Sequence, residues 1–134
     1  MGESDEGRRR ANRALKARSR ARLKRLRSDP VAYALVEHFA RQRRIGLRNL
    51  LQGTRGIGNA ALARQIAMYL VHVLLSRPQE VVGYLFVRER TTVSYACAAV
   101  EALRDEDAAL DVELRGIEAE GWSAFAQMEH RDAA

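Results

Sequence analysis

Hydrophobic residues recur at helical spacing along most of this chain. Between Val31 and Phe39 the apolar positions are spaced four, one and three residues apart, which places them on one face of a helix. Asp29 and Pro30 stand just before this run. They suit a helix start, because aspartate is a good N-cap and proline is tolerated at the first helical position. The pattern therefore predicts a helix that begins at about residue 30.

The same reading predicts five further helices, over about 47–51, 60–76, 78–86, 91–103 and 107–125. The helix over 60–76 is the most apolar and is expected at the centre of the core. In the helix over 78–86, Val81, Val82 and Leu85 are expected to point inward. The last predicted helix is capped by Asp107, and its glycines at 116 and 121 are expected to weaken or bend it.

Composition supports an all-α protein. The chain has 134 residues, which is the size of one domain, and 47% of them are hydrophobic but only 6% aromatic. The core must therefore consist mainly of Leu, Val, Ile and Ala. Two prolines and many strong helix formers favour an all-α helix-turn-helix bundle of about five to six helices. The single cysteine, Cys97, cannot form an internal disulfide and fits a reducing cytoplasm.

Charge is distributed unevenly and divides the chain into three predicted zones. Residues 1–28 form a basic arm, disordered or helical, 29–118 form the globular domain, and 119–134 form an acidic C-terminal extension. The net charge of +6 and the pI of about 10.2 indicate a polyanionic partner, either nucleic acid or an anionic membrane surface. The arm has three leucines and no aromatic residue, which makes it a poor membrane-surface helix. No run of about 20 apolar residues is present, so no membrane-spanning segment is expected. Together with the composition of the arm, this predicts no membrane partner.

Two blocks at a suitable separation carry a family resemblance. Residues 63–70 read ARQIAMYL, and residues 88–97 read RERTTVSYAC, followed by Val100 and Glu101. This pattern resembles the C-terminal DNA-binding domain of the bacterial replication initiator DnaA, over roughly 31–118. The resemblance implies a helix-turn-helix in which the last block opens the recognition helix. Such a helix presents its first residues to base edges in the major groove.

The resemblance also implies which residues contact DNA. The predicted DNA-binding residues are Arg55, Arg64, Gln65, Arg88, Glu89, Arg90, Thr91, Thr92 and Tyr95. Arg64 and Gln65 match the family's contacting pair, and Arg55 is assigned to the minor groove. Positions 89–92 match the base-reading run, where arginine suits guanine and threonine suits several bases. Tyr95 either packs or touches a phosphate.

Four departures from the family pattern stand out. Arg90 replaces a histidine and Glu89 replaces an aspartate at base-reading positions, so the preferred DNA sequence can differ from the usual initiator box. The usual Gly-Gly turn is absent, and Val87 stands where a glycine is usual. The loop before the long helix retains only Arg55 of its basic residues, and the basic arm is expected to replace that charge. No phosphate-binding loop of the form GxxxxGK[S/T] is present, which predicts a DNA reader without an ATPase.

We therefore expect a cytoplasmic, nucleoid-associated bacterial protein. Its expected partner is double-stranded DNA with initiator-box-like sites, and its expected role is regulation of replication initiation or transcription. The alternatives are a protein-interaction module and a non-specific nucleic-acid binder acting through the arm. Trp122 and Phe125 either complete the core or form a homodimer contact. We expect no enzyme activity, cofactor or metal, because the three histidines lie far apart and no catalytic constellation is present.

Overall fold

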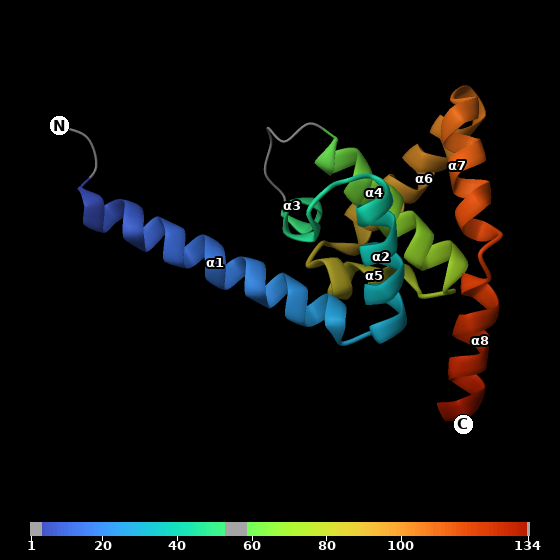
Figure 1. The fold of residues 1–134 in the computed structure, drawn as a ribbon, viewed down its shortest axis with the longest axis horizontal. Coiled ribbons are helices and arrows are strands. Elements are labelled where there is room, and N and C mark those ends of the chain that lie inside the picture. The colour runs from blue at the N-terminus through green and yellow to red at the C-terminus, as the bar shows by residue number, and fades with distance from the viewer. Residues whose placement is uncertain (1–3, 53–58, 134) are drawn as a thin grey trace.

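The computed structural model describes residues 4–52 and 59–133 and shows a bundle of helices with one long helix projecting from it (Figure 1). The helices are α1 (Asp5–Arg27), α2 (Pro30–Gln42), α3 (Leu47–Leu51), α4 (Ala60–Leu74), α5 (Gln79–Phe86), α6 (Arg90–Glu106), α7 (Ala108–Glu118) and α8 (Trp122–Ala133). The described ranges contain no β-strand. The predicted all-α class is confirmed. The described residues form more helices than the predicted five to six, because the basic arm is helical and the last predicted helix is divided into α7 and α8.

Helix α4 occupies the centre of the core. It packs against α2, α3, α5 and α6, and its buried residues include Ile66, Met68 and Leu70. A helix that is apolar around most of its circumference must be covered on several sides. The position predicted for this helix is therefore confirmed, and its neighbours α5 and α6 are fixed by packing against it.

The prediction for Val81 is wrong. Val82 and Leu85 are buried as expected, but Val81 retains 39% of its surface. Val81 shares the exposed side of α5 with Tyr84, which is 55% exposed, because helical residues three apart lie on the same face.

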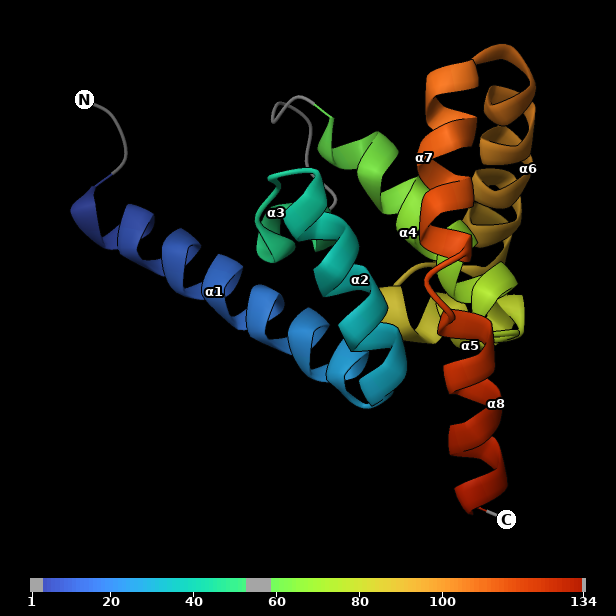
Figure 2. The ribbon, with the colours of Figure 1, turned by 45° about the vertical axis from the view of Figure 1, so that its right-hand side comes forward.

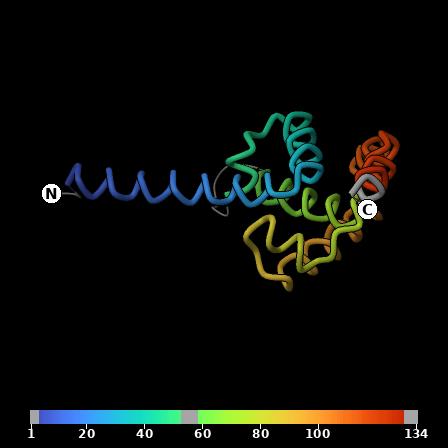
Figure 3. Tube along the Cα trace, turned by 90° about the horizontal axis from the view of Figure 1, so that it is seen from below, coloured from blue at the N-terminus to red at the C-terminus, as the bar shows by residue number. Residues whose placement is uncertain are grey.

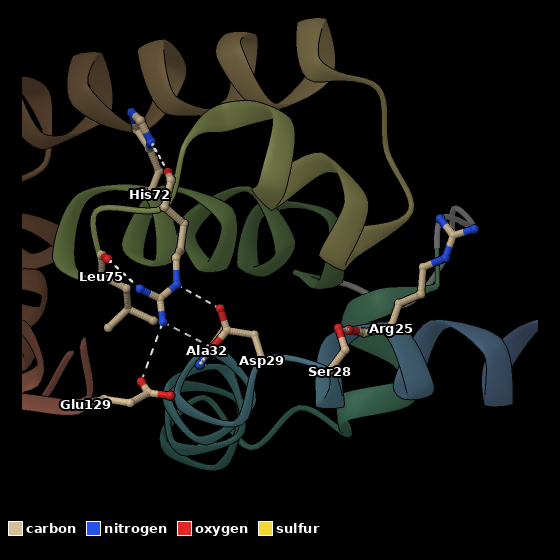
Figure 4. A network of polar contacts seen from close by, with 8 residues as sticks. Arg25, Ser28, Asp29, Ala32, His72, Leu75 and Glu129 are labelled. Carbon is tan, nitrogen blue, oxygen red and sulfur yellow. Dashed lines mark hydrogen bonds and ion pairs between the residues drawn. The ribbon is translucent and has the colours of Figure 1, made fainter. Parts of the chain in front are cut away.

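The start of α2 is tied to two other parts of the chain (Figure 4). Asp29 caps the helix by accepting a hydrogen bond from the Ala32 backbone N–H at 3.2 Å, as predicted. The same carboxylate accepts from Nε of Arg77, which follows α4, at 2.8 Å. Arg77 also forms an ion pair with Glu129 of α8 at 3.6 Å. This network joins α2, the α4–α5 connection and α8.

The last predicted helix is divided at residues 119–121. Gly121 has φ +92°, a left-handed conformation that favours glycine, and α8 begins directly after it. Trp122 is half-buried against the core, with its ring centroid 5.8 Å from that of His38. Phe125 remains 54% exposed. Trp122 therefore helps to complete the core, whereas Phe125 does not.

The basic arm is an anchored helix. Figures 1 and 2 show most of α1 projecting away from the other helices. Its C-terminal part contacts α2, α3 and α5, and there Leu23 and Leu26 are buried. Leu15, nearer the free end, is 43% exposed. None of the helices in the described ranges is long and apolar enough to cross a membrane.

Arg104 holds the far end of α6. Its guanidinium donates to Asp111 at 2.6 Å and to Glu118, both on α7, and to the Tyr69 hydroxyl of α4 at 3.0 Å. Its side chain is only 14% exposed. One arginine therefore connects three helices at the end of α6 that lies away from the α5–α6 turn.

Candidate nucleic-acid interface

Helices α5 and α6 are joined by three residues, Val87 to Glu89. The Arg88 N–H donates to the Gly83 carbonyl at 2.8 Å, and the Val87 N–H donates to the Tyr84 carbonyl at 3.3 Å. This pair of bonds is the Schellman motif, which closes a helix through a left-handed residue. Val87 occupies that position with φ 56° and ψ 51°. The turn therefore keeps the left-handed conformation although Val87, a β-branched residue, stands in place of the usual glycine.

Replacing Val87 with glycine should raise the free energy of unfolding by about 1 kcal/mol. A left-handed L-residue costs roughly 1–2 kcal/mol, and the extra backbone entropy of glycine offsets about 0.5–1 kcal/mol of the gain. Urea unfolding measures the change. The control, Val87→Ala, keeps a Cβ and should gain less. A Val87→Gly protein less stable than the parent would show that the turn does not hold Val87 in this conformation.

The first two turns of α6 present polar side chains to solvent. Arg90, Thr91, Thr92 and Tyr95 are all exposed, Tyr95 to 70%. Behind them, Val93, Ala96, Cys97 and Val100 are buried. The helix is thus fixed by its apolar face, and the opposite face at its N-terminal end is open.

Three arginines gather beside this end of α6. Partial burial and the charge of Arg22 lower the pKa of the Arg64 guanidinium. Burial and the charges of Arg64 and Arg22 lower the pKa of the Arg88 guanidinium in the same direction. Arg64 and Arg88 remain positively charged, because the guanidinium does not lose its proton in proteins. Arg22 comes from α1, Arg64 from α4 and Arg88 from the α5–α6 turn, so three separate elements build one positive cluster.

Two of these arginines also bind backbone carbonyls. Arg64 Nη1 donates to the carbonyls of Leu50 at 3.2 Å and Gln52 at 2.8 Å. Arg88 Nη2 donates to the carbonyl of Leu51 at 3.3 Å. The last carbonyls of a helix lack partners within the helix, so both arginines cap α3. Their guanidiniums are held in place before any ligand arrives.

The remaining predicted DNA-binding residues differ in their exposure and position relative to the N-terminal end of α6. Glu89 is exposed at the N-cap position of α6 without making a side-chain capping bond, and Gln65 is half-buried on α4. Arg55 lies outside the described residues. The sequence analysis missed Arg22, and it also missed Ser94, exposed on α6 three residues after Thr91. The i, i+3 spacing from Thr91 could have identified Ser94.

Cys97 belongs to the packing of α6. Burial raises the pKa of its thiol, and the charge of Glu101 raises it further. A buried thiol with a raised pKa is a poor nucleophile. Cys97 is therefore a core residue that holds α6 in place.

A short helix, a tight turn and a second helix with an open polar N-terminal end define a helix-turn-helix, the class of module that places its second helix in a DNA groove. Residues 36–100 match the model of the family described as the bacterial DnaA protein helix-turn-helix. This segment is a DnaA-type helix-turn-helix domain, which confirms the resemblance in the sequence.

The similar proteins are replication initiators. The chain is 40% identical over 60 residues to the chromosomal replication initiator protein DnaA 2 of Chlamydia muridarum, covering 45% of this chain and 13% of that protein. It is 33% identical over 90 residues to the initiator DnaA of Sphingopyxis alaskensis, covering 66% of this chain and 19% of that protein. The chain thus spans less than a fifth of the length of either relative. No solved structure matches the chain.

Proposed function

We propose that this protein binds double-stranded DNA sequence-specifically through α6 and thereby regulates replication initiation or transcription. The observation that carries the proposal is the open polar end of α6 lying beside the Arg22, Arg64 and Arg88 cluster. Thr91 and Thr92 supply hydroxyls and methyl groups for base edges, and Arg90 supplies paired donors for guanine. The arginine cluster supplies positive charge for the phosphates that flank the groove.

The initiator relatives suggest the DNA site to test first. Fluorescence anisotropy would compare a labelled duplex carrying an initiator box with a scrambled duplex of equal length, at two salt concentrations, because phosphate contacts make affinity salt-dependent. We expect a preference of at least tenfold, which corresponds to about 1.4 kcal/mol or more. Arg90 and Glu89 differ from the family pattern, so the preferred sequence can differ from the initiator box. If the two duplexes bind equally, the preferred site is therefore selected from random duplexes. Failure of that selection would refute sequence-specific binding.

Replacing Thr92 with alanine should reduce the discrimination between the preferred and scrambled duplexes by about fivefold, since a single threonine contact lies at the lower end of the roughly 1–3 kcal/mol that a bidentate base contact contributes. The affinity for the scrambled duplex should change little, because phosphate contacts dominate there. The same anisotropy titration measures both. Ser123→Ala on α8 is the control, because it removes an exposed hydroxyl outside the helix-turn-helix. Equal losses on both duplexes for Thr92→Ala would remove Thr92 from the reading positions.

A further inference from the structure

Helix α1 carries a second row of positive charge. Its members are Arg9, Arg13, Lys16, Arg20, Lys24 and Arg27, at steps of four, three, four, four and three residues. At about 100° per residue they fall within a sector of about 80°, and at about 1.5 Å per residue the row is about 27 Å long. We call these six residues the basic stripe.

The basic stripe does not face the helix-turn-helix. Other residues of α1 do so: Arg25 lies over the Tyr84 ring of α5, with its Cζ 4.9 Å from the ring centroid, and Arg22 belongs to the cluster described above. On the helical wheel, Arg22 and the stripe lie about 160° apart. Figure 3 shows α1 running between α2 and α3 on one side and α5 and α6 on the other. The two basic faces of α1 are therefore directed to different sides of the molecule.

The inner end of the stripe opens onto a hollow beside α3. The residues that line it are Arg20, Leu23, Lys24, Arg27, Ser28 and Arg48, around a volume of about 610 Å³. Arg48 comes from α3 and extends the positive surface beyond α1. Four cationic side chains from two helices thus surround one open hollow.

Most of this charge is not neutralised within the protein. Among the described side chains, no carboxylate lies within 4.0 Å of the side-chain nitrogens of Arg20, Lys24 or Arg48. Glu37, which lines the adjoining hollow, forms an ion pair with Arg41 at 3.0 Å. The 3.5 Å pair between Arg13 and Glu6 is exposed on both sides, and such pairs are weak. The stripe is available to an external polyanion.

We propose that the basic stripe, with Arg48, binds the phosphate backbone of a second duplex segment, separate from the duplex that α6 reads. A straight row of cations on a helix suits a regular line of phosphates, and it carries no base-reading geometry. Helix α1 contains no aromatic residue on which an unpaired base could stack, which disfavours single-stranded nucleic acid. It also lacks the bulky apolar face that an interfacial membrane helix requires. Binding of the first duplex by α6 is part of the proposed function, on which this proposal rests.

The number of short duplexes bound by one protein chain tests the proposal. Analytical ultracentrifugation at physiological salt would use the full chain and a labelled duplex with one initiator box or one selected site. The parent protein should bind two duplexes, and the triple variant Lys16→Gln, Arg20→Gln, Lys24→Gln should bind one. The second duplex should dissociate at least tenfold more readily from this variant. For the second duplex, the slope of log K against log salt should be shallower by about 2.7 in the variant, because each of the three lost phosphate contacts removes about 0.9.

The matched control is the triple variant Arg8→Gln, Arg10→Gln, Arg18→Gln. It removes the same charge from the same helix, but outside the stripe, and should still bind two duplexes. Circular dichroism checks that both variants keep α1 helical.

The outcomes separate this proposal from the proposed function. One duplex on the parent and none on the stripe variant would support the stripe and refute reading by α6. Equal stoichiometry for the parent and the stripe variant, or equal losses in both triple variants, would overturn the stripe proposal. If the stripe variant loses binding to a single-stranded oligonucleotide or an anionic vesicle that the parent holds more tightly than duplex, the assignment to duplex DNA is wrong.

Discussion

Replacing Leu26 with alanine is expected to lower the free energy of unfolding by about 3 kcal/mol, within the roughly 2–5 kcal/mol found for buried leucines. Leu26 is completely buried, in the part of α1 that contacts α2, α3 and α5. Its removal leaves a cavity where the projecting helix joins the core. Urea unfolding followed by circular dichroism measures the loss.

Leu15→Ala is the matched control for Leu26→Ala. It makes the same change on the same helix at a position that is 43% exposed, and surface changes usually stay within about 0.5 kcal/mol. If the two variants lose equal stability, the C-terminal part of α1 does not belong to the core.

Replacing Gly83 with alanine should destabilise the protein by about 3 kcal/mol, at the upper end of the typical cost of overpacking. A Cβ on Gly83 would stand 2.6 Å from the Arg88 carbonyl oxygen, closer than van der Waals contact allows. The obstructing atom is backbone and belongs to the turn, so the turn must move. Urea unfolding measures the stability, and anisotropy should show weaker discrimination between the preferred and scrambled duplexes, because α6 starts at this turn.

Gly116→Ala provides the control, because a Cβ at position 116 meets nothing within 4 Å. Alanine there should stabilise α7 by about 0.5–1 kcal/mol through lower backbone entropy in the unfolded chain. If Gly83→Ala were as stable as Gly116→Ala, the close approach of the turn to α5 would be refuted.

Much of the fold could be predicted because the signals are local. Asp29 and Asp107 were identified as caps from their positions before apolar runs, and both accept the expected backbone hydrogen bonds. The order and centrality of the helices followed from their apolar spacing. The anchoring of α1 could not be predicted in this way, since Leu23 and Leu26 are too few to define an apolar face. Their burial depends on surfaces supplied by other helices.

The candidate site was predicted unevenly for a similar reason. The exposed positions of α6 follow from helical periodicity together with the family resemblance, so Arg90, Thr91 and Thr92 could be named from the sequence. Arg22 could not be named, because its place beside Arg64 depends on how α1 crosses the bundle. The carbonyl bonds of Arg64 and Arg88 likewise depend on where α3 ends. The DNA contacts themselves remain predictions.

The Arg104 network has a consequence for the thermodynamics of recognition. Because Arg104 joins the far end of α6 to α4 and α7, the N-terminal end of α6 is already oriented in the free protein, and the proposed DNA binding there would lose little conformational entropy. The long side chains of the projecting part of α1 are exposed and lose about 0.5–1.5 kcal/mol each when immobilised. Released counterions, which favour binding through solution entropy, must offset that loss. One small chain would thus combine a rigid reader with a phosphate-binding surface whose affinity is set by the ionic strength around it.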